Sequence, residues 1–403
     1  MNMGRSGRTK HVLVINQFAL PRDQGGGTRH ADLFNRIPGW RALILAGDRN
    51  HYTRERFATT NPLFRLVSIP RAGAGAVSRL RSWIWYVMKA GAMSLRIDGI
   101  DVIVGSSPHL LAPVVGRFVA TVKRVPFVLE IRDLWPESLV SAGVLRESSP
   151  LHRALAVLER WLAIRADAII VVTPGWDRHF SELGVPGEKI HVVGNGTELS
   201  DFQVTIPRAE LRRKHSIQGF TAVFAGAHGP KDGLEYIIDA ADKCPEINFL
   251  LIGSGPAKAE IMAKARRMGL NNVQFRDPIP KYDLPELLAA CDVGVHSVTP
   301  LSVFDHGMSP NKLFDYLAAG IPIVSNARTP LRAVLEDDQC GRIGDAGSLA
   351  SNIRAVAEAD DATLSRWRAE ARCLMETTFS RAAAATVLKE VLNTVTNRAS
   401  AKP

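Results

Sequence analysis

Two series of short apolar segments constrain the fold of this 403-residue chain more than any other feature. The segments are rich in Val and Ile and do not alternate with polar residues. Such runs are typical of strands buried on both faces, as in a parallel sheet covered by helices. The first series comprises residues 11–16, 41–47, 101–107, 126–132, 167–173 and 189–195, and the second comprises residues 221–227, 248–254, 272–277, 292–298 and 321–327.

Amphipathic segments of helical length separate these strands, and examples are residues 149–166, 231–244 and 283–292. Repeated alternation of strand and helix predicts the α/β class, with a doubly wound parallel sheet in each half of the chain. Open parallel sheets bind ligands beyond the carboxyl ends of their strands, so function is expected at those ends.

A polar stretch, residues 194–220, separates the two series of strands. We therefore predict two Rossmann-like domains, residues 1–198 and 199–378. A C-terminal helix and tail, residues 379–403, follow them.

Net charge and composition narrow the classes of partner. The net charge of +10 favours an anionic partner, namely nucleic acid, a phosphorylated substrate or an acidic membrane surface, although a basic surface without a dedicated partner explains it equally well. No nucleic-acid-binding motif is present, so we expect no nucleic-acid partner. No apolar run is long enough to span a bilayer, and no cleavage site follows the first strand, so we expect a cytoplasmic protein. The four widely spaced cysteines predict free thiols: Cys244, Cys291, Cys340 and Cys373.

The stretch HGMSPNKLFDYLAAGIPIVSNA, residues 306–327, contains the most informative charged pair. Ser309 is predicted to cap a helix whose first turn contains Pro310, and Gly320 is predicted to end it. Lys312 adds a full positive charge to a helix N-terminus, which is already an anion site. Asp315 follows three residues later, so the pair suits a phosphate and a sugar diol. The alternative is a surface ion pair between Lys312 and Asp315 themselves.

Further polar and glycine-rich clusters follow other predicted strands. Glycine lets backbone amides approach a phosphate closely, whereas charged residues at a strand end suit either catalysis or a salt-bridged loop. No protease, kinase or metal-ligand motif is present, and we expect no metal site. The clusters are Gly25–Gly27, the trio Glu130, Arg132 and Asp133, the turn 226–233 with His228 and Lys231, and the turn 252–256 with Gly253.

Taken together, these motifs resemble family-four retaining glycosyltransferases with the GT-B fold. The resemblance covers nearly the whole chain and depends on the order and spacing of the motifs. Within the family, RDLWPES and SPNKLFDYLAAG are similar to bacterial enzymes of surface-polysaccharide assembly, of the N-acetylfucosamine-transferring type. The motifs are Gly25–Gly27, RDLWP (132–136), VVGNGTEL (192–199), FAGAHGPKDGLEYIIDAA (224–241), LLIGSGP (250–256) and SPNKLFDYLAAGIPIV (309–324).

The chain departs from the family pattern at several positions. The family has two acids eight residues apart; here Asp315 stands at the second position and Gly307 at the first. The usual Arg and Lys of the turn after the first strand of the second domain align with Ala227 and Asp232. A frequent His aligns with Arg132.

The resemblance implies that the C-terminal domain holds a nucleotide sugar and the N-terminal domain holds a glycan or lipid-linked acceptor, with no cofactor and no metal. Two alternatives remain: a nucleotide-sugar 2-epimerase and a non-catalytic nucleotide-sugar-binding protein. The implied catalytic residues are Glu130, Arg132 and Asp133. The implied acceptor residues are Arg29 and His109. The implied donor-binding residues are Gly26, Gly27, His228, Lys231, Gly253, Arg276, Asp277, Pro310, Asn311, Lys312 and Asp315.

Residues 76–97 mix aromatic and basic side chains. The segment is too short and too charged to span a bilayer, but it could lie at a membrane interface. A helix packed on the N-terminal sheet is the alternative. The interface hypothesis places Trp83, Trp85, Tyr86 and Met88 at the membrane, with the cations Arg79, Arg81, Lys89 and Arg96 on anionic headgroups.

Overall fold

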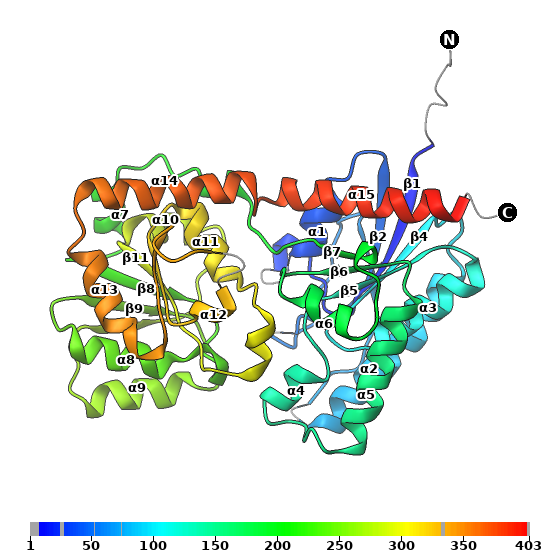
Figure 1. Ribbon diagram of the computed structural model, residues 1–403, viewed down its shortest axis with the longest axis horizontal. Helices are drawn as coiled ribbons and strands as arrows, with labels where there is room; N and C mark the ends of the chain where they lie inside the picture. The colour runs from blue at the N-terminus through cyan, green and yellow to red at the C-terminus, as the bar shows by residue number, and fades with distance from the viewer. Residues whose placement is uncertain (1–7, 25–27, 52, 74, 332–334, 401–403) are drawn as a thin grey trace, which may run out of the picture. The chain divides into compact units, whose positions relative to one another are not determined.

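The computed structural model describes residues 8–24, 28–51, 53–73, 75–331 and 335–400. The chain forms two compact units (Figure 1). The first contains residues 1–172, 176–194 and 382–403, and the second contains residues 173–175 and 195–381. The units therefore part between Gly194 and Asn195, close to the predicted boundary after residue 198, and most of the predicted C-terminal tail belongs to the first unit.

In the first unit, the described residues form a seven-stranded sheet in the order β3-β2-β1-β4-β5-β6-β7. Every neighbouring pair of strands is parallel. The order reverses at β1, as in a doubly wound fold. The strands are β1 (Lys10–Ile15), β2 (Trp40–Gly47), β3 (Phe64–Val67), β4 (Val102–Ser106), β5 (Phe127–Ile131), β6 (Ala168–Val171) and β7 (Ile190–Val192).

Helices cover this sheet because both of its faces are apolar. The C-terminal helix α15 (Arg381–Ser400) packs Leu388 and Leu392 against the face that carries Val12 and Val14. Buried Tyr86 of helix α2 (Ala76–Leu95) donates a hydrogen bond to the carbonyl of Leu45 in β2, at 2.6 Å. The helices between the strands are α1 (Arg29–Phe34), α2 (Ala76–Leu95), α3 (Leu111–Lys123), α4 (Glu137–Ser141), α5 (Pro150–Arg165) and α6 (Trp176–Glu182).

In the second unit, the described residues form a six-stranded parallel sheet in the order β10-β9-β8-β11-β12-β13. Successive residues of β9 (Asn248–Ile252) alternate between the two cores, with Leu250 in one and Phe249 and Leu251 in the other. The other strands are β8 (Thr221–Ala225), β10 (Val273–Arg276), β11 (Val293–His296), β12 (Ile323–Ser325) and β13 (Gly341–Ile343). The prediction of an α/β fold with two doubly wound parallel sheets is confirmed.

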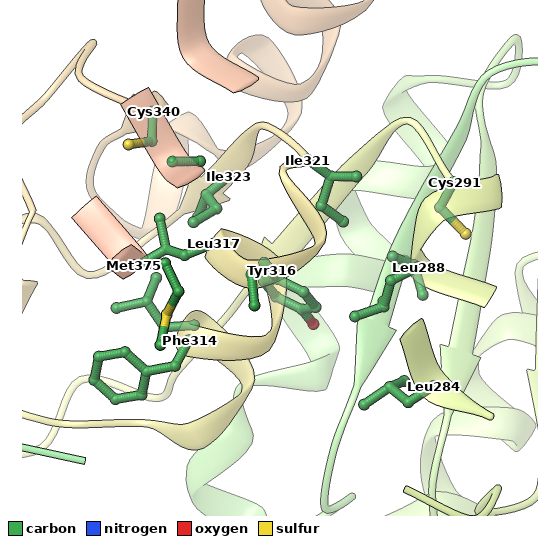
Figure 2. Packing of buried hydrophobic residues seen from close by; sticks show 14 of the residues in the cluster. Leu284, Leu288, Cys291, Phe314, Tyr316, Leu317, Ile321, Ile323, Cys340 and Met375 are labelled. Carbon is green, nitrogen blue, oxygen red and sulfur yellow. The ribbon is translucent and has the colours of Figure 1, made fainter. Parts of the chain in front are cut away.

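Helices also cover both faces of the second sheet. Helix α11 (Asn311–Ala319) contributes Phe314, Tyr316 and Leu317 to one core, where Met375 of α14 (Asp361–Thr377) joins them (Figure 2). The remaining helices are α7 (Arg208–Lys214), α8 (Leu234–Lys243), α9 (Lys258–Arg267), α10 (Leu284–Ala290), α12 (Arg328–Leu331) and α13 (Leu349–Ala357).

Candidate functional site

Helix α11 begins one residue later than the sequence suggested. Pro310 is extended, with φ −75° and ψ 129°, so Pro310 and not Ser309 is the N-cap residue, and the prediction that Ser309 caps the helix is wrong. Among the described side chains, none caps the first turn. The backbone amides of that turn and the positive end of the helix dipole therefore face the carboxyl end of the sheet without a side-chain acceptor. Gly320 ends the helix with φ +63°, as predicted.

Lys312 is a nearly buried cation at this helix start. Its Nζ lies 2.8 Å from Oδ1 of Asp232 and 4.0 Å from the ring centroid of Phe224 in β8. Burial lowers the pKa of Lys312, and the adjacent Asp232 carboxylate opposes this shift. Asp232, which stands where the family pattern has a lysine, is therefore the counter-ion of Lys312 from helix α11.

Asp315 has a different partner. Lys281 lies 2.5 Å from its carboxylate, and the Asp315 side chain is 9% exposed. The predicted alternative, a surface ion pair between Lys312 and Asp315, is wrong because each residue pairs with a different segment of the chain. The helix start therefore presents a buried cation and a buried anion, each with its own counter-ion.

Two glycine-containing turns meet beside Lys312. Gly253 has φ +145°, and a Cβ atom there would lie 1.8 Å from the carbonyl oxygen of Gly226. At Gly255, a Cβ atom would lie 2.4 Å from the carbonyl oxygen of His228. Only glycine allows these backbones to pack so closely. The contact brings the ends of β8 and β9 together, where a ligand of a parallel sheet binds.

His228 is fully buried between these turns, and neither of its ring nitrogens has a hydrogen-bond partner among the described residues. Burial lowers its pKa, and nearby Lys258 lowers it further, so the ring is neutral near pH 7. Buried polar atoms are nearly always paired, so this exception points to a polar group that is supplied by a ligand or by water.

Two further residues near this site were not predicted from the sequence. Lys258 donates hydrogen bonds to the carbonyl of Gly253, at 2.9 Å, and to the carboxylate of Asp277, at 2.8 Å. It therefore fixes the turn that carries Gly253. His296, at the end of β11, is buried and contacts Oγ of Ser325 at 2.8 Å. Burial, with a smaller effect of Lys312, lowers its pKa to about 3.

The remaining predicted donor-binding residues lie around the same sheet edge, but they are exposed or contact groups other than Lys312 and His228. Lys231 and Asn311 are exposed, and Pro310 is half-buried. Arg276 turns its guanidinium to the carbonyl of His215, at 2.8 Å, and Asp277 is 93% exposed. Gly26 and Gly27, and the whole loop Gly25–Gly27, lie outside the described residues.

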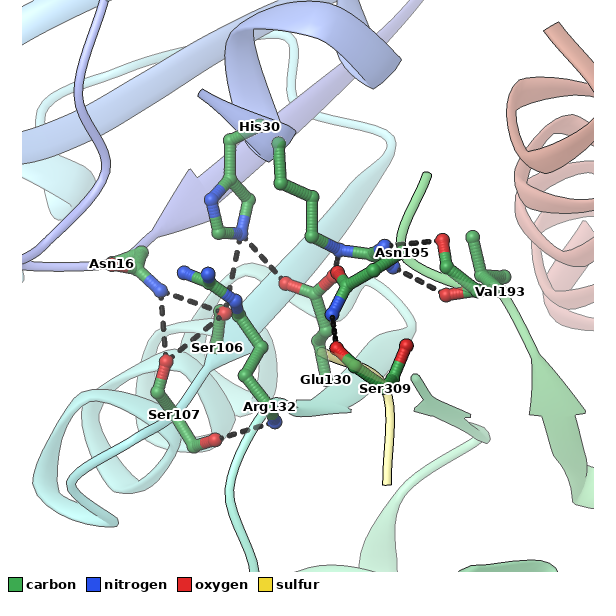
Figure 3. Close-up of polar contacts among 11 residues, drawn as sticks. Asn16, His30, Ser106, Ser107, Glu130, Arg132, Val193, Asn195 and Ser309 are labelled. Carbon is green, nitrogen blue, oxygen red and sulfur yellow. Dashed lines mark hydrogen bonds and ion pairs between the residues drawn. The ribbon is translucent and has the colours of Figure 1, made fainter. Parts of the chain in front are cut away.

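In the first unit, Glu130, the residue before the last of β5, lies within a buried ionic network (Figure 3). One carboxylate oxygen accepts a hydrogen bond from Arg29 at 3.0 Å, and the other lies 2.7 Å from Nε2 of His30. Burial alone would raise the pKa of Glu130, but His30 and Arg29 hold it well below its usual range. Arg29 also donates to the carbonyls of Val193 and Gly194, both at 2.6 Å.

The Glu130 network fits a positioning role better than contact with substrate. Glu130 and Arg29 are each only 2% exposed, and their polar atoms are engaged with one another and with the end of β7. Asp133 accepts a short hydrogen bond from Ser138. Of the predicted catalytic trio, Arg132 has the least engaged side chain, because its buried Nε has no hydrogen-bond partner among the described residues.

His109, a predicted acceptor residue, lies beneath a pocket of about 330 Å³ in the first unit. Its Nε2 lies 3.1 Å from Oε1 of Gln17, which lines the pocket, and its ring stacks on Trp83 with centroids 5.1 Å apart. Burial lowers the pKa of His109 to about 4, so the ring is neutral near pH 7.

Helix α2 has one buried face and one exposed face. Tyr86 is fully buried and Trp83 packs on His109, so the prediction that both lie at a membrane interface is wrong. Trp85 and Met88 are 48% and 67% exposed. In the part of the chain that the structure describes, no helix is long and apolar enough to cross a membrane, and no cluster of three His, Cys, Asp or Glu side chains could hold a metal ion.

Each of the two units contains a segment that matches a known protein family. Residues 36–196 match a glycosyl transferase 4-like domain, and residues 219–359 match the glycosyl transferases group 1 domain. The chain carries two glycosyltransferase-family domains. The match also agrees with the GT-B fold predicted from the sequence.

Curated relatives carry names from bacterial surface-polysaccharide synthesis. The chain is 27% identical over 248 residues to WcaI of Escherichia coli strain K12, whose name assigns it to colanic acid biosynthesis as a glycosyl transferase. It is 25% identical over 198 residues to TuaH of Bacillus subtilis strain 168, whose name assigns it to teichuronic acid biosynthesis. The alignments cover 59% and 49% of this chain, and they span 60% and 49% of the relatives' own length.

Solved structures with the same fold cover almost the whole chain. Anabaena Alr3699/HepE, solved in complex with UDP and glucose, matches with a TM-score of 0.72 and 19% identity, over 96% of this chain and all of that one. Sucrose-phosphate synthase from Thermosynechococcus elongatus matches with a TM-score of 0.77 and 17% identity over the same shares. At these identities the likeness establishes the GT-B fold alone.

Proposed function

We propose that this protein is a retaining glycosyltransferase of cell-surface polysaccharide synthesis. It would transfer a sugar from a nucleotide-sugar donor, of the UDP-sugar class, to a hydroxyl group of a glycan or polyprenyl-linked acceptor. The observation that carries the proposal is the nearly buried Lys312 at the uncapped start of α11, beside the turns of Gly226 and Gly253. The names of WcaI and TuaH and the UDP in the HepE complex support it.

The second unit would bind the nucleotide sugar. Lys312 and the amides at the start of α11 would bind the diphosphate, since a helix N-terminus and a cation both attract phosphate. Asp315 would bind the ribose hydroxyls, and the backbone of residues 276–278 would meet the base. His228 would offer its unpaired nitrogens to the sugar or phosphate, supported by their burial without partners.

During transfer, the bond between the anomeric carbon and the diphosphate oxygen breaks, and a bond from that carbon to the acceptor oxygen forms on the same face. The acceptor proton passes to the leaving diphosphate, so no dedicated base is needed. Lys312 and the α11 amides would stabilise the negative charge that develops on the diphosphate. We propose that these groups suffice without a metal ion.

The first unit would hold the acceptor, and the N-terminal region 1–198 would thus be the acceptor domain and residues 199–378 the donor domain. Glu130 and Arg29 would keep the end of β5 in place, and Arg132 and Asp133 would orient the sugar or acceptor. Within the family, the motifs RDLWPES and SPNKLFDYLAAG support the N-acetylfucosamine-transferring subgroup.

A panel of radiolabelled nucleotide sugars, incubated with the protein and a bacterial membrane extract, tests the proposal. Label that appears in lipid or glycan for one donor is the expected result. Isomerised donor without transfer would identify an epimerase, and intact donor with measurable binding would identify a binding protein. Transfer should persist in EDTA; activity that is lost on chelation and restored by manganese or magnesium would refute metal independence.

A further inference from the structure

The pocket of about 330 Å³ in the first unit has the composition of an anion site. It lies where β1, β2 and β3 end, and the N-terminal half of α2 forms one wall. Arg49, Arg54 and Arg79 line it, and none of its lining residues that the structure describes is a carboxylate. Its volume is in the range that accommodates a small ligand.

The three arginines have no carboxylate partner among the described residues. Arg49 is anchored through Nε, which donates to the carbonyl of Ile69 at 3.1 Å. The nearby carboxylate of Asp48 pairs with Arg56 at 3.3 Å and accepts from the amide of Ile69 at 2.9 Å, so both of its oxygens are engaged by groups other than the pocket arginines. Three unneutralised guanidinium groups around one cavity create a strong local attraction for anions.

An aromatic wall completes the pocket. Trp83 and Phe18 both line it, and both contact His109, at centroid distances of 5.1 and 5.6 Å. Gln17 is held between His109 and Ser82, whose Oγ accepts from it at 3.3 Å. The pocket lining therefore combines cationic, aromatic and amide side chains, which suits a ligand with both an anionic and an apolar or sugar-like part.

We propose that this pocket binds the phosphate or diphosphate ester of the acceptor. The assignment rests on the proposed function, because it names the chemistry of the acceptor that the first unit would hold. A guanidinium group can donate two parallel hydrogen bonds to two oxygens of one phosphate. Three guanidinium groups therefore provide more donors than a single carboxylate can accept. A diphosphate accepts all three.

The outward face of the same wall favours a lipid-linked ester over a free one. Helix α2 presents its pocket residues Arg79 and Trp83 on one side, and its exposed apolar side chains include Val77, Trp85 and Met88. A single helix therefore lines the anion pocket and also exposes the apolar and basic side chains that an acidic lipid surface attracts.

Calorimetric titration with a water-soluble short-chain prenyl diphosphate, in saturating UDP to occupy the donor site, tests the assignment. Arg54→Gln and Arg79→Gln should each weaken its binding about tenfold or more, because each removes a charge-assisted hydrogen bond. Both side chains are exposed, so neither substitution threatens the fold. Arg153→Gln, at an exposed position of α5 in the same unit but outside the pocket lining, is the matched control and should bind like the parent.

Titrations with other ligands distinguish a lipid-linked phosphate ester from a free one. Inorganic pyrophosphate that binds more weakly than the prenyl diphosphate, with the same loss in the arginine variants, supports a lipid-linked ester. Equal affinity supports the diphosphate site but assigns it to a free ester. A prenyl alcohol that binds as well as the diphosphate, or arginine variants that bind like Arg153→Gln, would overturn the proposal. Absence of UDP binding would refute the proposed donor site instead, and the titration without UDP would still decide the pocket.

Discussion

The ion pair between Lys312 and Asp232 allows a test in which two substitutions have opposite effects on nucleotide binding. Nζ and Oδ1 lie 2.8 Å apart, and the two side chains are 10% and 14% exposed. At an effective dielectric constant of about 20, two unit charges at this distance attract by about 6 kcal/mol. The cost of removing both groups from water offsets much of that, so the pair itself adds little net stability, whereas a single partner left alone is costly.

Lys312→Met keeps the apolar stem of the side chain and removes the charge. Asp232 is then left without its cation, although it still accepts a hydrogen bond from the amide of Gly229 at 3.1 Å. Because the Asp232 carboxylate keeps this hydrogen bond, we expect the free energy of unfolding to fall by about 1–3 kcal/mol, the range for a buried polar group left partly unsatisfied. UDP should bind about 10- to 100-fold more weakly, since a charge-assisted hydrogen bond to phosphate contributes about 1.5–3 kcal/mol.

Asp232→Asn should have the opposite effect on binding. It removes a carboxylate that competes with phosphate for Lys312, so UDP affinity should stay the same or rise while stability falls. Isothermal titration with UDP measures the affinity, and urea unfolding measures the stability. Lys264→Met is the control, because it breaks an ion pair with Asp239 between helices α8 and α9 of the same unit.

Two results would refute this reasoning. An unchanged UDP affinity in Lys312→Met would exclude contact between this lysine and the diphosphate. A loss of affinity in Asp232→Asn that matches the loss in Lys312→Met would show that both act only by holding the local structure together.

Three further predictions follow from other features. Gly253→Ala should lower the free energy of unfolding by roughly 2–4 kcal/mol and weaken UDP binding, because its Cβ would lie 1.8 Å from a carbonyl oxygen. Gly347→Ala is the control: its Cβ would have open space around it, so the free energy of unfolding should change by less than about 0.5 kcal/mol. Equal effects of the two substitutions in urea unfolding would contradict the tight contact at Gly253. His296, with a folded-state pKa of about 3, binds fewer protons than the unfolded chain below pH 6.5, so its contribution to stability falls as the pH drops from there towards 3. The stability difference between the parent and His296→Gln should therefore shift by about 2 kcal/mol between pH 7 and pH 5, and a pH-independent difference would show that the ring protonates normally. The protein should sediment with vesicles that contain anionic lipid at low salt, and less of it should sediment at high salt. The double variant Trp85→Ser with Met88→Ser should sediment less still, whereas Tyr282→Ser, at another exposed aromatic residue, should behave like the parent. Sedimentation at background level with both anionic and neutral vesicles would refute the membrane contact.

The sequence predicted the central strands of both sheets because their apolar runs are continuous. It missed β3 and β13, and both are edge strands in their sheets. Polar residues such as Arg65 and Arg342 interrupt these two short strands, whereas the other two edge strands, β7 and β10, were predicted. The central strands carry longer apolar runs, since both of their faces are covered, although β2 and β5 also contain Arg41 and Glu130.

The site was predictable in its residue types but not in its pairings. Lys312 and Asp315 were recognised from a helix start, yet their counter-ions lie 80 and 34 residues away in the chain. Likewise, the charges at the end of β5 were recognised, but their burial depends on Arg29 and His30 from α1. Pairings between distant segments depend on the packing of the sheet, which periodicity and spacing do not specify.

These pairings also set the energetics of binding at the start of α11. A buried cation without a counter-ion is costly, and Asp232 removes that cost in the protein itself. A bound diphosphate therefore has to displace Asp232 from Lys312 or share the lysine with it. The net free energy of binding from this contact is the difference between the Lys312–diphosphate and Lys312–Asp232 ion pairs. The same holds at Asp315, where a ribose diol must compete with Lys281. Affinity for the nucleotide should accordingly be moderate, and substitutions of the competing partners, Asp232 and Lys281, should raise it more readily than substitutions that add new cations.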